Sequence, residues 1–190
     1  MSIVLASASP RRKQILEMLG FGDFSIIPAK GEEVVPEGAA PDKIVACLAG
    51  AKAREVAAKC SSEDIVIAAD TIVWYNNQVY GKPSSADNAF EMLTALSGNT
   101  HAVYTGICII RGGELICETE RSLVTFRSIS EKEIRGYIST GEPFDKAGAY
   151  AAQGKAAQFV ERIEGDFFNV MGLPVCRLCL MLKRLGVELY

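Results

Sequence analysis

A short apolar strand that runs directly into a polar loop and a helix opens the chain, and this arrangement restricts its possible folds more than any other feature. Ile3-Val4-Leu5 has the length and branching of a buried strand. Ser9 stands where a helix N-cap belongs, Pro10 suits the first helical position, and apolar residues then recur at helical spacing. A buried strand followed at once by a helix indicates an α/β protein.

Two hydroxyls and three cations surround the start of this helix. Ser7 and Ser9 lie in the loop, and Arg11, Arg12 and Lys13 occupy the first turn. Backbone N–H groups at a helix start attract anions, whereas cations there oppose the helix dipole. An anionic ligand would remove that conflict. The alternative from the pattern alone is a solvated basic turn.

Strands and helices alternate through the first half of the chain, and a long hairpin follows. The expected strands are 3–5, 24–27, 65–69, 71–75, 78–80, 103–111, 114–126 and 159–163, and the expected helices are 10–19, 41–59, 86–96, 130–138 and 173–185. Asp70 stands at the end of the continuous apolar run 65–69, and residues 145–154 are expected to form a tight loop outside the core. The mixture of alternation and hairpin predicts a mixed rather than a purely parallel sheet.

The cysteines do not form an evident metal or redox motif. Cys176-x-x-Cys179 lies in an apolar helical pattern without a second pair, so we interpret it as helix packing. The favoured hairpin turn at Gly112-Gly113 places Cys108 directly opposite Cys117. Because no signal peptide precedes the first strand, we expect a cytoplasmic protein in which this pair stays reduced.

Charge and histidine content narrow the kinds of ligand. The formal net charge of -3 argues against a protein that coats nucleic acid, and no apolar stretch approaches the roughly 20 residues of a membrane span. His101 is the only histidine, so neither a multi-histidine metal site nor a Ser–His catalytic pair elsewhere in the chain is available. Any metal must therefore be held by carboxylates, phosphates and water, which suits Mg²⁺ or Mn²⁺.

A set of short motifs in a fixed order carries a family resemblance. The motifs are Ser7-x-Ser9-Pro10-Arg11-Arg12, Ala69-Asp70-Thr71, Gly81-Lys82-Pro83, Leu96-Ser97-Gly98, Val124-Thr125-Phe126-Arg127, Gly141-Glu142-Pro143, Asp145-Lys146-Ala147-Gly148-Ala149-Tyr150, Gln153-Gly154 and Gly172-Leu173-Pro174. Together they strongly resemble the Maf family of nucleotide pyrophosphatases, from Leu5 to Pro174. The resemblance implies one domain over residues 1–190, with an elongated mixed sheet and two lobes flanking a cleft, as in the related inosine-triphosphate pyrophosphatases.

The resemblance also implies a reaction and a set of site residues. The reaction is hydrolysis of a nucleoside triphosphate to a monophosphate and pyrophosphate. Positions that match those lining the family's phosphate site are Ser7, Arg11, Arg12, Lys52 and Lys82. Glu33 and Asp70 match positions that hold a divalent metal, Mg²⁺ or Mn²⁺, and Asp70 is best placed as the general base. Asp70 as a metal ligand only is the open alternative.

Substrate choice depends on the branch of the family. The stretch from Asp145 to Gly154 resembles the branch that acts on dTTP and UTP, and Arg11, Thr71 and Gln153 match its specificity positions. The other main branch, which acts on 7-methyl-GTP, differs here. Gln153 could pair with the imide edge of a pyrimidine or satisfy loop backbone groups. A homodimer is implied by the resemblance alone, and a nucleotide-binding regulator of septum formation with little catalysis is the alternative function.

Overall fold

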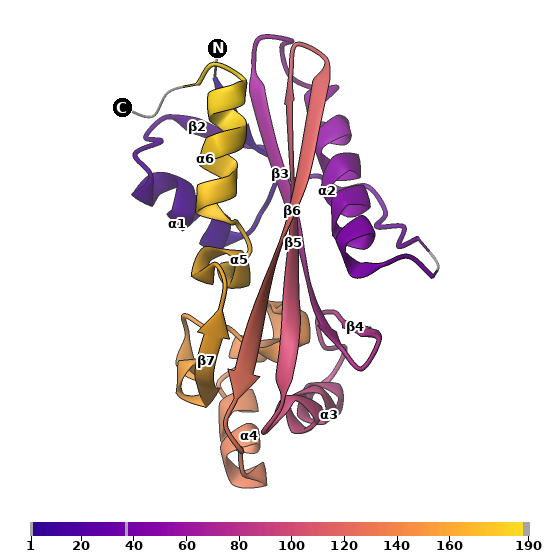
Figure 1. Cartoon of the computed structure of the whole chain (residues 1–190), viewed down its shortest axis with the longest axis vertical. Coiled ribbons are helices and arrows are strands. Elements are labelled where there is room, and N and C mark those ends of the chain that lie inside the picture. Colours follow the sequence, from indigo (N-terminus) through magenta and orange to yellow (C-terminus); the bar gives the residue numbers. More distant parts are fainter. Residues whose placement is uncertain (1, 37, 188–190) are drawn as a thin grey trace. The chain divides into compact units, whose positions relative to one another are not determined.

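A computed structural model describes residues 2–36 and 38–187 and contains one mixed sheet of seven strands (Figure 1). The hydrogen-bonded order is β2-β1-β3-β5-β6-β7, and β4 pairs with β3. The predicted mixed sheet is thus confirmed. The chain divides into two compact units. The first unit comprises the residues up to Asp70, Thr105–Glu120 and the residues from Gly172 onward, and the second comprises Thr71–Tyr104 and Arg121–Met171.

The observed elements follow the predicted ones closely. The strands are β1 (Ile3–Leu5), β2 (Phe24–Ile26), β3 (Ile65–Tyr75), β4 (Gln78–Tyr80), β5 (Thr100–Arg111), β6 (Glu114–Phe126) and β7 (Val160–Glu164). The helices are α1 (Pro10–Met18), α2 (Pro41–Ala57), α3 (Ala86–Leu96), α4 (Glu131–Ile138), α5 (Phe167–Met171) and α6 (Val175–Arg184), with 3₁₀ turns η1 (Glu142–Asp145), η2 (Ala147–Ala149) and η3 (Lys155–Phe159). The five-residue helix α5 was not predicted, because a single helical turn leaves almost no periodicity in a sequence.

In the first unit, β1 pairs in parallel with β2 and with β3, so that Ile3 faces both Phe24 and Ile65. Figure 1 shows α1 and α6 on one side of these strands and α2 on the other. Small residues on α2, including Ala49 and Ala53, belong to a buried cluster with residues of β1, β3 and β5. Helix α2 comes very close to β5 at Gly106, where an added Cβ would lie 2.4 Å from the carbonyl oxygen of Val45.

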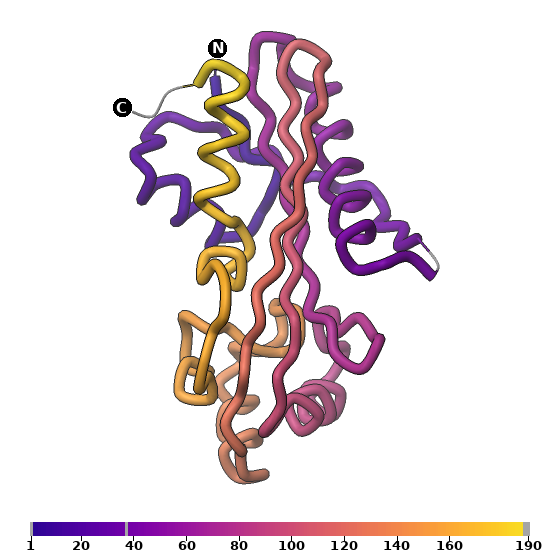
Figure 2. The backbone as a smooth tube through the Cα atoms, in the orientation of Figure 1, coloured from indigo at the N-terminus to yellow at the C-terminus, as the bar shows by residue number. Residues whose placement is uncertain are grey.

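The hairpin register is as predicted, but the redox state is not. Figure 2 shows the two long strands of the hairpin running side by side. Gly112 and Gly113, in the turn that joins β5 to β6, both have positive φ. Cys108 and Cys117 face each other with a Cα–Cα distance of 4.1 Å and are joined by a disulfide. The prediction of reduced thiols is therefore wrong. Directly opposed residues in an antiparallel pair bring their Cβ atoms within disulfide reach, whereas the prediction rested on the inferred compartment.

The second unit has its own apolar core. Side chains from α3, α4, β5, β6 and η3 fill it, with Phe126 and Phe159 among the largest. The core also buries His101, whose Nε2 lies 2.8 Å from the hydroxyl oxygen of Tyr150. The segment predicted as a loop outside the core is partly wrong, because Gly148 to Ala152 are buried there. Small side chains let this backbone pack inside, and Tyr150 supplies a large ring.

Within the described ranges, no helix has both the length and the apolar character needed to cross a membrane.

Candidate active site

Asp70 lies inside a continuous strand and not at a strand end as the sequence predicted. It is the sixth of the eleven residues of β3 and is 7% exposed. The two expected strands merge because β-branched and aromatic residues follow Asp70 without a glycine or proline to interrupt pairing. A carboxylate in this place needs a polar partner, since an unpaired buried charge is costly.

Lys52 is that partner, and it joins two carboxylates. Its Nζ lies 2.5 Å from Oδ1 of Asp70 and 2.6 Å from Oε1 of Glu33. Helix α2 presents Lys52 from a face rich in alanine and glycine, which leaves room beside the strand. The side chains of Lys52 and Asp70 are 19% and 10% exposed, whereas that of Glu33 is 57% exposed. The three charges thus meet at a point that solvent reaches from the side of Glu33.

The loop that carries Glu33 is held by a second residue of α2. The carboxylate of Glu55 accepts hydrogen bonds from the backbone N–H groups of Lys30 and Gly31, with the shortest at 2.9 Å. The hydrogen-bonded ion pair with Lys59, followed by these backbone hydrogen bonds, lowers the pKa of Glu55 to about 2. Glu55 is a supporting residue that the sequence analysis missed, because its contact with residues 30 and 31 depends on the folded chain.

Arg12 belongs to the same group of charges. Its Nη1 donates to Oγ of Ser7 at 3.0 Å, and its Nε donates to the carbonyl oxygen of Gly172 at 2.8 Å. Burial lowers the pKa of the Arg12 guanidinium, the nearby charge of Asp70 opposes that shift, and Arg11 adds to it. Arg12 therefore lies in the electrostatic field of Asp70 and Glu33, and Arg11 is close enough to Arg12 to act on its charge. The predicted site residues in the first unit are therefore Ser7, Arg11, Arg12, Glu33, Lys52 and Asp70.

Helix α1 begins where the sequence predicts, but its start lacks the side-chain hydrogen bond that an N-cap serine usually accepts. Ser9 is the N-cap residue and Pro10 is in the first turn, yet the Ser9 side chain makes no capping hydrogen bond. The first turn also contains no acidic residue. Its positive end is therefore not neutralised by a local carboxylate.

The remaining three predicted site residues belong to the second unit. Thr71 is the next residue of β3 after Asp70 and is half-buried, Lys82 is exposed after β4, and Gln153 is exposed in a turn. The carbonyl oxygen of Gly81 accepts a hydrogen bond from the N–H of Gly148 at 3.0 Å, which links two of the sequence motifs inside this unit. The structure thus brings six predicted residues together in the first unit and places three in the second.

The residues present suit a divalent cation shared with a phosphate ligand. Glu33 and Asp70 direct carboxylate oxygens at one ammonium, so the same two oxygens could bind one cation. Over residues 2–36 and 38–187, no group of three or more histidine, cysteine, aspartate or glutamate side chains is arranged to hold a metal. Two carboxylates with the other positions left to phosphates and water are typical of Mg²⁺ sites.

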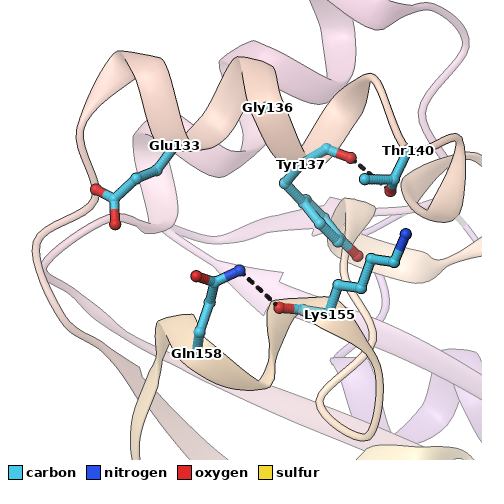
Figure 3. Close-up of a pocket in the computed structure, with 6 residues that line it drawn as sticks. All are labelled: Glu133, Gly136, Tyr137, Thr140, Lys155 and Gln158. Atoms are coloured by element: carbon cyan, nitrogen blue, oxygen red, sulfur yellow. Dashed lines mark hydrogen bonds between the residues drawn. The ribbon is translucent and has the colours of Figure 1, made fainter.

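A separate pocket of about 360 Å³ lies in the second unit between α4 and η3 (Figure 3). It is lined by Glu133, Gly136, Tyr137, Thr140, Lys155 and Gln158, none of which is a predicted site residue. Two hydrogen bonds join lining residues: Gln158 donates to the carbonyl oxygen of Lys155, and Thr140 donates to that of Tyr137.

Comparison with known proteins identifies relatives over nearly the whole chain. The family model described as "Maf-like protein" matches residues 2–185. A protein of Caldicellulosiruptor bescii named "dTTP/UTP pyrophosphatase" is 47% identical over 192 residues, which cover 98% of this chain and 96% of that protein. A Bacillus cereus protein of the same name is 46% identical over 186 residues, with the same coverage.

Solved structures support the fold alone. The Ham1 protein of Staphylococcus aureus has a TM-score of 0.52 at 17% identity, and a HAM1 protein from Coxiella burnetii has a TM-score of 0.54 at 16% identity. Each comparison covers 97% of this chain and 99% of the other.

Proposed function

Because the chain belongs to the Maf family, we propose that it hydrolyses dTTP and UTP to the nucleoside monophosphate and pyrophosphate. The observation that carries this proposal is the contact of Lys52 with both Asp70 and Glu33, next to Arg12. A protein that only binds a triphosphate needs cations. A buried carboxylate among them would weaken that binding unless it takes part in the chemistry.

Ser7, Arg11, Arg12, Lys52 and Lys82 are the proposed phosphate ligands. A triphosphate carries about four negative charges, and dispersing them lowers the barrier at the reacting phosphorus. Arginine can hold two phosphate oxygens in parallel, while lysine acts as a compact charge. The Ser7 hydroxyl and the Gly172 carbonyl oxygen hold the Arg12 guanidinium in a fixed orientation, which reduces the entropy lost when phosphate binds.

Glu33 and Asp70 are the proposed ligands of Mg²⁺ or Mn²⁺. The cation supplies charge neutralisation and lowers the pKa of water when bound. Asp70 accepts the proton of the attacking water, an oxygen–phosphorus bond forms, and the α–β anhydride bond breaks with pyrophosphate as the leaving group. Lys52 pairs with Asp70 in the free protein, and its proposed role with nucleotide bound is to contact a phosphate oxygen.

Arg11, Thr71 and Gln153 are the proposed determinants of base preference. The Gln153 side chain is exposed and makes no intramolecular hydrogen bond within the described residues. That observation favours a ligand-reading role over the alternative in which the amide satisfies its own loop. We also propose that residues 1–190 act as one catalytic domain in the cytoplasm and that the chain forms a homodimer.

The test is pyrophosphate release from dTTP and UTP, measured with Mg²⁺, with Mn²⁺ and with a chelator. We expect pyrophosphate release to require a divalent cation and to slow by roughly 100- to 10,000-fold in Asp70→Asn. Asp23→Asn, a matched change at an exposed carboxylate, should leave the rate unaltered. Nucleotide binding without release in any metal would overturn the hydrolase and favour the regulator.

A further inference from the structure

Glu142 makes contacts that the proposed reaction does not use. Its Oε1 accepts a hydrogen bond from the backbone N–H of Lys155 at 3.0 Å, and its Oε2 lies 3.2 Å from the same nitrogen. The hydroxyl of Tyr137 donates to Oε1 at 3.0 Å. One carboxylate at the start of η1 therefore fastens the start of η3 to α4. All of these residues belong to the second unit.

The contact with Glu142 is the reason a glycine is needed at position 154. Its φ of -106° is negative and does not by itself call for glycine. An added Cβ would lie only 2.4 Å from Oε1 of Glu142 and 2.8 Å from its Cδ. Real Cβ atoms essentially never come so close, so the carboxylate can approach the backbone of residues 154 and 155 only because residue 154 has no side chain.

The fastened backbone is the turn that carries Gln153. The N–H of Gly154 donates to the carbonyl oxygen of Ala151 at 3.0 Å, which closes a four-residue turn with Gln153 at its third position. Ala151 and Ala152 are buried on one side of Gln153, and Glu142 holds the chain on the other side. The backbone of Gln153 is thus fixed at both ends while its amide remains exposed.

We infer that Glu142 is a positioning residue that fixes the turn of residues 151–154 and thereby sets the preference for the nucleotide base. This inference rests on the proposed function, in which Gln153 reads the base. The Glu142 carboxylate accepts from one N–H donor, the backbone of Lys155, and from one O–H donor, the hydroxyl of Tyr137. A carboxylate suits this place because hydrogen bonds to a charged acceptor are stronger than neutral ones. Tyr137 is 3% exposed, and its side chain in Figure 3 reaches from α4 toward the start of η3, where Lys155 lies.

The test compares the ratio of kcat/KM for dTTP to that for dCTP, which differ at the imide edge of the base. In Glu142→Gln the amide NH₂ replaces one acceptor, so we expect the ratio to fall about fivefold, as for the loss of one hydrogen bond. Gly154→Ala, which pushes the same contact apart, should lower the ratio similarly. The matched control is Glu131→Gln, at an exposed carboxylate of α4, which should leave the ratio unchanged.

A double-mutant comparison separates positioning from general damage. In a Gln153→Ala background, Glu142→Gln should change the ratio less than about twofold, because the residue through which it acts is gone. If Glu142→Gln does not fold, Tyr137→Phe removes one donor and leaves the contact with Lys155, and a smaller fall in the ratio is expected. Thermal melting of each variant reports folding independently.

The experiment distinguishes failure of the proposed base-reading role of Gln153 from failure of the positioning role of Glu142. An unchanged ratio in Gln153→Ala would remove the base-reading role from the proposed function, and the inference with it. A lowered ratio in Gln153→Ala together with an unchanged ratio in folded Glu142→Gln and Gly154→Ala would overturn the positioning role alone. Equal losses for dTTP and dCTP in Glu142→Gln would also overturn it, because they would indicate a purely structural role.

Discussion

His101 is expected to make the stability of this protein depend on pH. The ring is 2% exposed, packs edge-on against Phe126 with ring centroids 5.0 Å apart, and has one nitrogen, Nδ1, without a hydrogen-bond partner. Burial lowers the pKa of His101 from its usual 6.5 to about 4. A protonated ring would place a charge in this apolar core, so the folded state keeps the neutral form.

The sign and size of the effect follow from that pKa. Between pH 6.5 and 4 the unfolded chain takes up a proton that the folded chain does not, so stability falls as pH falls through this range. With a folded pKa of about 4, the loss from this group is about 2 kcal/mol at pH 5 and about 3 kcal/mol at pH 4. This is a large part of the 5–15 kcal/mol that stabilises a typical domain.

Urea unfolding at several pH values, followed by circular dichroism, measures the effect. The comparison is with His101→Gln, which keeps a polar side chain but cannot titrate; the difference in unfolding free energy between the two proteins cancels carboxylates that titrate in both. Tyr150→Phe is the control, because it removes the hydroxyl that contacts Nε2 and leaves the histidine in place. The reasoning is refuted if wild type and His101→Gln lose stability in parallel between pH 7 and pH 4.

Three further predictions concern the first unit. Asp70→Asn should lower kcat for dTTP by roughly 100- to 10,000-fold with nucleotide binding retained in calorimetry with metal, and near-normal turnover would eliminate Asp70 as the base. Thiol titration of the denatured protein without reductant should count four of the six cysteines, since Cys108 and Cys117 are bonded; a count of six would contradict the disulfide. Gly106→Ala should reduce the unfolding free energy by about 1–3 kcal/mol in urea, because its Cβ meets the Val45 carbonyl, and an unchanged value would show that α2 can shift at no cost.

Local patterns were sufficient to predict most of the elements. The N-terminal strand and helix, the helix near residue 130 and the glycine turn at the tip of the hairpin all occur as expected, and a capping box of Ser130 and Glu133 begins the second of these helices. Each of these signals lies within a few residues of sequence, where spacing and turn chemistry act directly. Patterning failed at Asp70, because a single carboxylate does not interrupt a strand when a lysine from another element pairs with it.

The contacts that assemble the site could not be read from spacing. Glu33 and Asp70 lie on either side of Lys52 in the sequence, and only the packing of α2 against β3 brings the three charges together. The same holds for Glu142, which lies in the Gly141-Glu142-Pro143 motif, because its contact with the backbone of Lys155 depends on the folded chain. The oxidation of the cysteine pair depends on chemistry that a hairpin register does not encode.

The hydrogen bond from Arg12 to Gly172 bears on how the protein becomes active during synthesis. The two residues are 160 positions apart, and the first unit is completed only by the segment from Gly172 onward, which includes α6. Chains are made from the N-terminus, and domains commonly fold in that order. Here Arg12, one of the proposed phosphate ligands, is synthesised well before the residue that accepts its hydrogen bond. A nascent chain that stops before residue 172 lacks this anchor, so Arg12 can take its observed orientation only after Gly172 has been synthesised.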